Sequence, residues 1–209
     1  MASSSEPALN ASREHMRVVD SRGQIDSNSD IELMSRLRSG DLQALGSLFL
    51  RHHARVYELC FRLCGDSQTA DDLVQEIFLR VLRYRSNFAG KAAFPTWLNR
   101  IARNVCLDHF AKTKRRRSAQ YQALESLSEE SESSIDFPDE RLTFLNKALM
   151  ALPLEKREVL VLSRYHNLSY AEIGKVCNCS ESAVKVRVHR ALRQLRDLYF
   201  ELDRENDEV

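Results

Sequence analysis

Apolar residues recur at intervals of three and four positions along most of the chain, and no segment alternates with a period of two over a convincing length. The first pattern predicts amphipathic helices, whereas half-buried strands would have produced the second. Residues 29–117 are expected to form one group of helices and residues 140–203 a second, smaller one. The sequence therefore predicts an all-α protein of two small helical domains, joined by a flexible acidic linker over 118–139.

Glycines, a proline and a capping box indicate where individual helices begin and end. Gly40 and Gly65 follow apolar runs directly and are expected to end the first two helices. Pro95 suits the first turn of a fourth helix. A backbone N–H in that turn would have no intrahelical partner, so proline, which lacks one, loses no hydrogen bond there. Ser169 with Glu172 three residues later is typical of a capping box. A short helix is therefore expected to begin there.

Composition excludes several classes of protein. The 209 residues include only 6 Gly and 4 Pro, which argues against turn-rich all-β or low-complexity chains. No apolar run reaches the roughly 18 residues of a membrane span, and the Ser-rich segment 1–28, expected to be disordered, has no secretory pattern. We therefore expect a cytoplasmic protein without membrane insertion. Five cysteines without a CxxC pair argue against a disulfide framework.

Charge is strongly segregated although the net charge is only +1. Residues 112–117 form a basic block, residues 118–140 carry acidic side chains without Lys or Arg, and basic residues dominate again after Glu181. A short acidic tail over 204–209 follows. Blocks of this kind usually mark interaction surfaces or tails. The two basic blocks predict contacts with a polyanion.

The segment from Ser169 to about residue 202 predicts two helices joined by a tight turn. Val184, Val188 and Ala191 fall on the apolar side of the second helix, and basic side chains fall mostly opposite. This arrangement is typical of a helix-turn-helix, whose second helix enters the major groove of DNA. The alternative is an amphipathic helix with a solvated basic face, although such faces normally mix both signs of charge.

At this point a family resemblance is evident. The second helical group resembles region 4 of a bacterial RNA polymerase sigma factor of the sigma-70 family, in the stretch LPLEKREVLVLSRYHNLSYAEIGKVCNCSESAVKVRVHRALRQLRDL. The first group resembles region 2, in ADDLVQEIFLRVLRYRSNF followed by FPTWLNRIARNVCLDHFAKTKRRR. The order and separation are similar to those of the extracytoplasmic-function (ECF) group, which lacks the domain between regions 2 and 4. The resemblance implies a non-enzymatic, cofactor-free subunit that binds core RNA polymerase, recognises the −35 and −10 promoter elements and helps to melt the promoter.

The resemblance assigns core polymerase binding to the third helix, against a coiled coil of the largest subunit, with a further contact at the flap of the second-largest subunit. A polar, largely acidic face suits a partner helix that carries Arg. The same face also suits plain solvation with i,i+4 ion pairs. The residues expected at the contact are Asp71, Asp72, Gln75, Glu76 and Arg80.

The resemblance assigns −10 recognition and melting to an aromatic-containing loop and the basic helix after it. Unpaired bases need stacking surfaces and a positive groove to hold them. Trp97 is expected in the core, since large aromatic side chains mainly supply buried area. The residues expected to contact the −10 element are Asn87, Phe88, Phe94, Asn99, Arg100, Arg103, Asn104, Arg115 and Arg116.

The second helix of the helix-turn-helix is expected to read the −35 element. The chain departs from the common family pattern at two positions, with Ala183 where Thr is usual and Val186 where Ser is usual. Val186 donates no hydrogen bond but suits a thymine methyl group. These departures change the promoter sequence that we expect this helix to recognise. They do not change its expected role in −35 recognition. The residues expected at this contact are Ser182, Lys185, Val186, Arg187, His189, Arg190 and Arg193.

Two other functions are less consistent with the sequence. A free-standing helix-turn-helix regulator would use the N-terminal domain for dimerisation, but such a domain needs no FPTWLNRIARN melting segment. A metal-dependent hydrolase would use His52 and His53 with acidic residues, yet no ligand spacing supports it. Cys60 and Cys64 are interpreted as small buried hydrophobes rather than metal ligands.

The acidic linker has two interpretations, a spacer extended by its own charge or, by resemblance, a segment that follows the polymerase RNA-exit path. Two small domains on such a linker are expected to share no large interface, which leaves both binding surfaces open to an inhibitory anti-sigma factor. The segment 1–28 is the alternative inhibitor, acting in cis.

Overall fold

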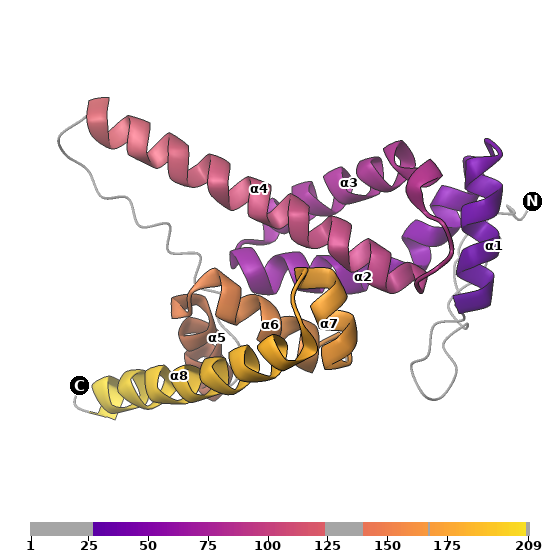
Figure 1. Cartoon of the computed structure of the whole chain (residues 1–209). Helices are drawn as coiled ribbons and strands as arrows, with labels where there is room; N and C mark the ends of the chain where they lie inside the picture. The colour runs from indigo at the N-terminus through magenta and orange to yellow at the C-terminus, as the bar shows by residue number, and fades with distance from the viewer. Residues whose placement is uncertain (1–26, 124–139, 167, 208–209) are drawn as a thin grey trace, which may run out of the picture.

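The structure is a computed structural model that describes residues 27–123, 140–166 and 168–207 (Figure 1). These residues form α-helices and one 3₁₀ turn without any strand, which confirms the all-α prediction for the described part of the chain. None of these helices is long and apolar enough to cross a membrane. The predicted segment 1–28 and linker 118–139 lie mostly outside the described residues.

The helices are α1 (Ser27–Arg38), α2 (Gln43–Cys64), α3 (Ser67–Arg83), α4 (Phe94–Ala123), α5 (Glu140–Ala151), α6 (Leu154–Arg164), α7 (Tyr170–Cys177) and α8 (Glu181–Asp207), with the 3₁₀ turn η1 at Arg85–Asn87.

We call α1–α4 the N-terminal unit. Its centre is the pair α2 and α3, whose buried faces carry Leu59, Leu63, Ile77 and Val81 among others. Asp66 caps α3, because its side chain accepts a hydrogen bond of 2.6 Å from the Thr69 backbone N–H. The helix therefore begins at Ser67, directly after its cap.

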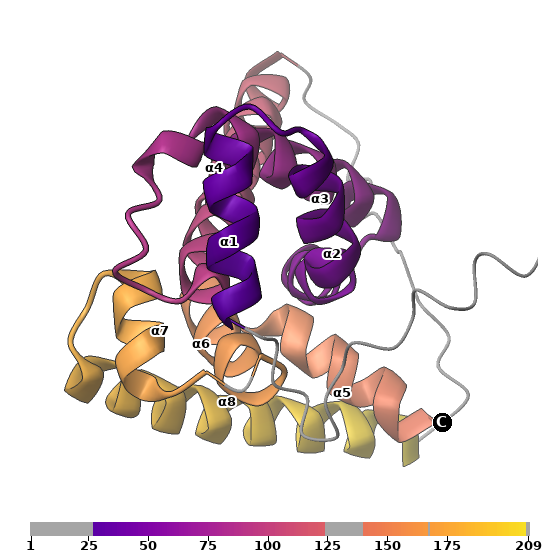
Figure 2. The same cartoon turned by 90° about the vertical axis from the view of Figure 1, so that its right-hand side faces the viewer.

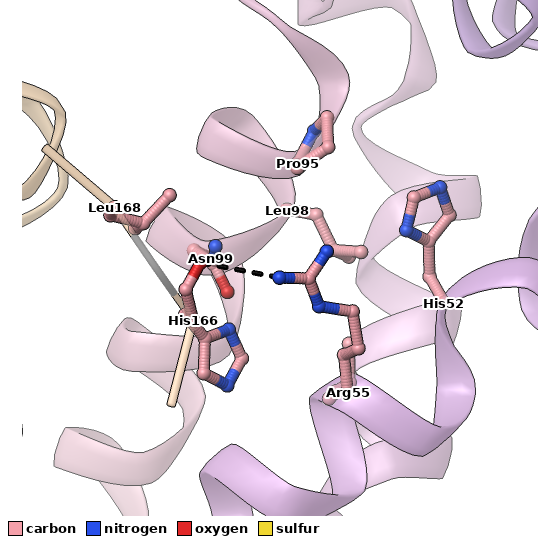
Figure 3. A pocket seen from close by; sticks show the side chains of 8 residues that line it. His52, Arg55, Pro95, Leu98, Asn99, His166 and Leu168 are labelled. Carbon is pink, nitrogen blue, oxygen red and sulfur yellow. Dashed lines mark hydrogen bonds between the residues drawn. The ribbon is translucent and has the colours of Figure 1, made fainter. Parts of the chain in front are cut away.

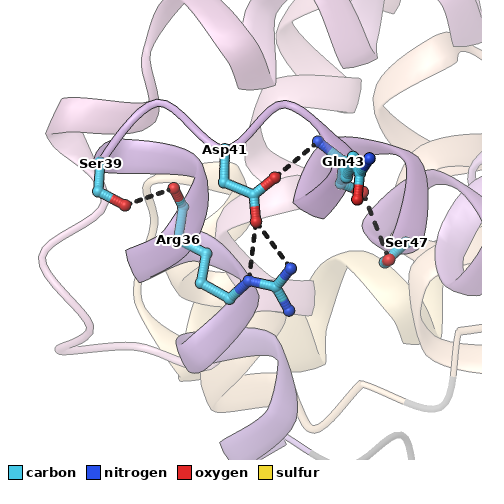
Figure 4. Close-up of polar contacts among 5 residues, drawn as sticks. All are labelled: Arg36, Ser39, Asp41, Gln43 and Ser47. Atoms are coloured by element: carbon cyan, nitrogen blue, oxygen red, sulfur yellow. Dashed lines mark hydrogen bonds and ion pairs between the residues drawn. The ribbon is translucent and has the colours of Figure 1, made fainter.

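The turn between α1 and α2 is fixed by a left-handed glycine and an acidic side chain (Figure 4). Gly40 has φ 103°, a conformation that residues with a Cβ rarely adopt. The Asp41 carboxylate accepts from the Gln43 backbone N–H at 3.0 Å and from the Arg36 side chain at 2.7 Å. The hydrogen bond from Arg36 holds the pKa of Asp41 below its ordinary value. The predicted stop at Gly40 is therefore confirmed.

Helix α4 is the longest described element and extends beyond the other helices of its unit (Figure 1). It begins at Phe94, with Pro95 in its first turn as predicted. It continues to Ala123, so residues 118–123, which the sequence assigned to the start of the linker, are helical. The exposed side chains near its far end include Lys112, Lys114, Arg115 and Arg116.

We call α5–α8 the C-terminal unit. Helix α8 runs beneath α5, α6 and α7 and packs against all three (Figure 2). Val184, Val188 and Ala191 are buried on its inner side, which confirms the predicted apolar stripe at these positions. Gln194 accepts a hydrogen bond from Lys156 of α6, which ties the middle of α8 to the unit.

The two units pack directly on each other: α4 contacts α7, and α2 contacts α5 and α6. The expectation that they share no large interface is therefore wrong. The reason is that arginines of α2 that look solvent-facing in the sequence reach across the junction. Arg62 stacks on Tyr165 with 3.6 Å from its guanidinium carbon to the ring centroid, and Arg55 donates to the His166 carbonyl at 3.2 Å.

Candidate nucleic-acid and protein interfaces

Helices α7 and α8 form a helix-turn-helix whose turn is closed by local hydrogen bonds. Ser169 and Glu172 make the predicted capping box at the start of α7. Asn178 ends α7 in the left-handed region, at φ 54°. Ser180 then accepts a hydrogen bond of 3.2 Å from the Ala183 backbone N–H and so starts α8. These contacts fix the angle at which α8 leaves the turn.

Gly174 allows the turn to close, a role that was not predicted from the sequence. A Cβ atom at this position would lie 2.7 Å from the Cys179 carbonyl oxygen, closer than real Cβ contacts. The backbone of the turn therefore lies directly against α7. The available signal was a glycine inside an otherwise helical pattern. Glycine destabilises a helix relative to alanine, so a glycine at such a position often has a packing reason.

The predicted −35 residues lie on α8, and most of them share one exposed stripe. Their spacing of three and four places them on the same side of the helix. Arg187 differs, because it is half-buried beside that stripe. Val186 is 49% exposed, an unusual position for a large apolar side chain on a polar face. The exposed members are Ser182, Lys185, Val186, His189, Arg190 and Arg193.

The predicted polymerase-binding residues of α3 also lie on an outer face. Asp71, Asp72, Gln75 and Glu76 are exposed. Arg80 is half-buried, and its guanidinium pairs with Glu76 at 2.7 Å and with Asp108 of α4 at 2.9 Å. Arg80 therefore also braces α3 against α4.

Leu79 lies on the same outer side of α3 and is 61% exposed. It follows Asp72, Gln75 and Glu76 at helical spacing, so it adds an apolar centre to an otherwise polar face. Leu79 was not among the contact residues predicted from the sequence. The available signal was a leucine outside the inward stripe of its helix.

The structure divides the predicted −10 residues into exposed and buried sets. Phe88 and Phe94 are buried, at 4% and 0% exposure, and pack edge-to-face with their ring centroids 5.8 Å apart. Trp97 is half-buried beside them, consistent with its expected core role. These aromatic rings shape the loop from inside rather than present a stacking surface. The exposed set is Asn87, Arg100, Asn104, Arg115 and Arg116.

The remaining two −10 residues face the C-terminal unit. Asn99 is buried, and the Arg103 guanidinium forms an ion pair with Glu158 of α6, which is itself buried. Glu158 also accepts from the Cys177 thiol, with 3.4 Å between sulfur and oxygen. Burial, and secondarily the Glu158 charge, raises the pKa of the Cys177 thiol to about 12. Arg103 and Asn99 are thus covered in this arrangement.

A small cavity of about 50 Å³ lies at the junction of the two units (Figure 3). Arg55 and His52 line it from α2, Asn99 from α4, and His166 from the turn before α7. Burial, with a smaller effect of the Arg55 charge, lowers the pKa of His166 to about 4. The Nε2 atom of His166 has no hydrogen-bond partner among the described residues. The histidine is therefore held neutral inside the junction.

Three cysteines of the N-terminal unit lie in or beside its core. Cys60 and Cys106 are buried with their sulfur atoms 3.9 Å apart, and their contact and burial raise the pKa of the Cys60 thiol. Burial raises the pKa of Cys64 to about 11. Within the described ranges no group of three or more His, Cys, Asp or Glu side chains is placed to hold a metal ion.

Comparison with known proteins finds two family models, which together cover more than half of the chain. The family model "Sigma-70 region 2" matches residues 48–116, and "Sigma-70, region 4" matches residues 145–195. The RNA polymerase sigma-H factor of Pseudomonas aeruginosa is 31% identical, over 80% of this chain and 92% of that protein. The ECF RNA polymerase sigma factor SigW of Bacillus subtilis is 32% identical, over 79% of this chain and 96% of that protein.

Solved structures show the same architecture. The structure of CnrH in complex with the cytosolic domain of CnrY matches with a TM-score of 0.60 and 25% identity, over 81% of this chain and 96% of that chain. The sigma factor RpoE of Bartonella quintana, in complex with the anti-sigma factor NepR, matches in fold with a TM-score of 0.57 and 24% identity, over 73% of this chain and 94% of that chain.

The chain therefore belongs to the sigma-70 family of RNA polymerase sigma factors, in its ECF group. Its function is to direct RNA polymerase to promoters.

Proposed function

We propose that this chain is a dissociable promoter-specificity subunit that holds core polymerase through α3, reads the −35 element with α8 and reads the −10 element with α4. The proposed functional division is a region 2 domain over 29–117, a linker over 118–139 and a region 4 domain over 140–203. The observation that carries the proposal is the exposed stripe of α8, which joins three cations to Ser182 and Val186 directly after a helix-turn-helix turn. A stripe of this composition suits both phosphates and base edges.

The two basic surfaces would act differently on DNA. On α8, Lys185 and Arg190 lie within the first three turns, and recognition helices contact base edges with their N-terminal part. On α4, the exposed cations near residue 115 lie more than three turns after the loop and suit phosphate contacts without sequence information. The −35 contact would therefore supply discrimination, and the end of α4 would supply salt-dependent affinity.

The outer face of α3 supports a protein partner rather than DNA, because acidic groups repel phosphates. Asp72 and Glu76 suit cationic side chains of a partner helix, and Leu79 supplies the apolar contact that protein interfaces usually have at their centre. We assign this partner as the coiled coil of the largest polymerase subunit, with a second contact between the C-terminal unit and the flap of the second-largest subunit.

Under the same proposal, the chain has no catalytic activity. It acts in the cytoplasm, where core polymerase and promoters meet. An anti-sigma factor is a further proposed partner, since the RpoE match is a complex with one. It would compete for surfaces on α3 and α8.

Transcription with purified core polymerase and a library of promoter fragments tests the proposal. The full chain should yield transcripts from a subset of fragments that share two elements. Binding to duplex fragments without any core-dependent transcript would favour the free-standing helix-turn-helix regulator. Deletion of residues 1–28 in the same assay tests inhibition in cis, which predicts a higher transcript yield after truncation.

A further inference from the structure

Val186 is an apolar side chain that the core of the C-terminal unit does not use. It lies two positions from each of the buried residues Val184 and Val188, which is about 200° of rotation along a helix. Val186 therefore points away from the core, and it is 49% exposed. An exposed valine also favours a helix less than alanine does. The stability of the unit therefore does not explain a valine at this position.

The neighbours of Val186 on this face of α8 are polar or cationic. Ser182 lies one turn before it and Arg190 one turn after it. Lys185 and His189 lie beside it, and all four side chains are exposed. Protein interfaces are depleted of charged side chains at their apolar centre, so this face suits a protein partner poorly. An apolar group among cations instead matches the major groove of DNA, where thymine methyl groups lie between two rows of phosphates.

The side chain of Val186 is short, so it reaches only groups that lie close to the backbone of α8. It belongs to the second turn of α8, and recognition helices contact base edges with their N-terminal part. Ser182, its neighbour one turn earlier, is small enough to permit a close approach. A valine in a helix adopts mainly one rotamer, so a contact with a base costs it little conformational entropy. Val186 is therefore placed and shaped to contact the edge of one base.

The chemistry of valine limits what this contact recognises. Its side chain offers methyl groups and neither donates nor accepts a hydrogen bond, so it does not distinguish the O4 acceptor of thymine from the N4 donor of cytosine. The apolar group that thymine presents in the major groove is its C5 methyl. A cytosine methylated at C5 carries a methyl group at the same ring position. The contact therefore depends on the methyl group and not on the rest of the base.

We propose that Val186 is a methyl-specific contact in the −35 element. It favours thymine or 5-methylcytosine at one position over uracil or unmethylated cytosine at the same position. This inference rests on the proposed use of α8 in −35 recognition. It assigns one determinant of the promoter sequence to a single side chain, and it makes promoter recognition by this chain sensitive to C5 methylation of cytosine at that position.

Holoenzyme assembled from core polymerase and the full chain tests the proposal on a promoter obtained from the fragment library. Each thymine of the −35 element, on either strand, is replaced singly by deoxyuridine, which still pairs with adenine and lacks only the C5 methyl. Competition between fragments measures the affinities. Affinity should fall about fourfold at the position that Val186 contacts, which is the value of burying one methyl group. At that position 5-methylcytosine should bind about fourfold more tightly than cytosine, each paired with guanine.

Val186→Ala identifies the side chain responsible. The substitution removes the valine methyl groups and favours the helix, so the variant should fold. It should bind the thymine promoter about fourfold more weakly and lose nothing further when that thymine becomes deoxyuridine, because both changes remove the same contact. Phe200→Ala is the matched control, since Phe200 is 50% exposed on the same helix. It lies about 20 Å further along α8 and should keep the full effect of the methyl group.

Three results would overturn the inference and leave the proposed function intact, because the promoter is still recognised in each. One is equal affinity for thymine and deoxyuridine at every position of the −35 element. Another is a methyl effect at each sensitive position that persists unchanged in Val186→Ala. The third is a loss in Val186→Ala that is equal on all sequences, which would identify a contact with the DNA backbone or with protein. The absence of core-dependent promoter binding by the original chain would instead overturn the proposed function.

Discussion

The carboxylate of Asp30 lies 3.0 Å from Nε2 of His52, and both side chains are almost completely buried. The second oxygen of Asp30 lies 2.5 Å from the Arg51 guanidinium, so one acid from α1 holds two successive side chains of α2. The His52 ring in turn packs 5.0 Å from the ring of Phe94, at the start of α4. Asp30 lies outside the region 2 match, yet it supports the base of the predicted −10 loop.

Replacement of Asp30 by Ala should destabilise the protein by about 3–5 kcal/mol, because it leaves buried partners of a carboxylate without their acceptor. The free energy of unfolding in urea measures this loss. Glu32→Ala is the matched control on the same helix, and its exposed side chain should change stability by no more than about 0.5 kcal/mol. Equal effects of the two substitutions would show that the buried pair does not stabilise the fold.

Gly174→Ala should destabilise the helix-turn-helix by about 1–3 kcal/mol, since the new methyl group meets the Cys179 carbonyl oxygen and the backbone must shift. Gly46→Ala on α2 is the control, because nothing lies within 4 Å of a Cβ atom there. That change should stabilise α2 by about 0.5–1 kcal/mol through helix propensity. Urea unfolding of both variants tests the pair. A stable Gly174→Ala protein would contradict the tight turn.

Lys185→Ala and Arg190→Ala should each reduce discrimination at the −35 element by about 1–3 kcal/mol if the side chains contact bases. Binding of the holoenzyme to matched and mismatched −35 sequences at several salt concentrations measures this. Arg204→Ala, in the last turn of α8, is the control and should leave discrimination unchanged. An equal loss on every sequence, with a salt slope reduced by about one, would instead identify phosphate contacts.

Leu79→Ser should weaken binding to core polymerase by about tenfold, or 1.4 kcal/mol, because it removes the apolar centre of the α3 face. Asp72→Lys and Glu76→Lys should also weaken it through charge reversal. Leu50→Ser is the control, since Leu50 is 71% exposed on α2. Competition between chains for a limited amount of core polymerase measures the affinities. Unchanged binding of all three α3 variants would exclude this helix from the interface.

Acidification should destabilise the fold through His166. The folded chain holds this ring neutral, with a pKa of about 4, whereas the unfolded chain binds a proton near 6.5. The unfolded state therefore gains its proton first as the pH falls, and stability is lost between about pH 6.5 and pH 4. The full effect is on the order of 3 kcal/mol.

Replacing His166 with Gln should remove this part of the pH dependence, measured as the difference between urea unfolding curves at pH 7 and pH 4.5. His189→Gln is the control, because His189 is exposed on α8. If His166→Gln loses as much stability on acidification as the original chain, the buried histidine is not the group responsible.

The amino-acid sequence by itself determined the helices and the outer faces. Gly40, Gly65, Pro95 and the Ser169 capping box act within a few residues, so their effects are readable without a tertiary structure. The exposed stripe of α8 was also predictable, because the helical period assigns each residue a side once the apolar positions are known. The same reasoning placed Asp72 and Glu76 on the outside of α3.

Only the tertiary structure decided which polar residues are covered by distant parts of the chain. Arg103 and Glu158 are 55 residues apart, and no local pattern distinguishes Arg103 from its exposed neighbour Arg100. Burial of Asn99 at the junction of the two units, like closure of the junction by Arg55, arises from packing between elements. Local periodicity fixes which side of a helix is polar, but long-range contacts determine whether that side meets water, DNA or the other half of the molecule.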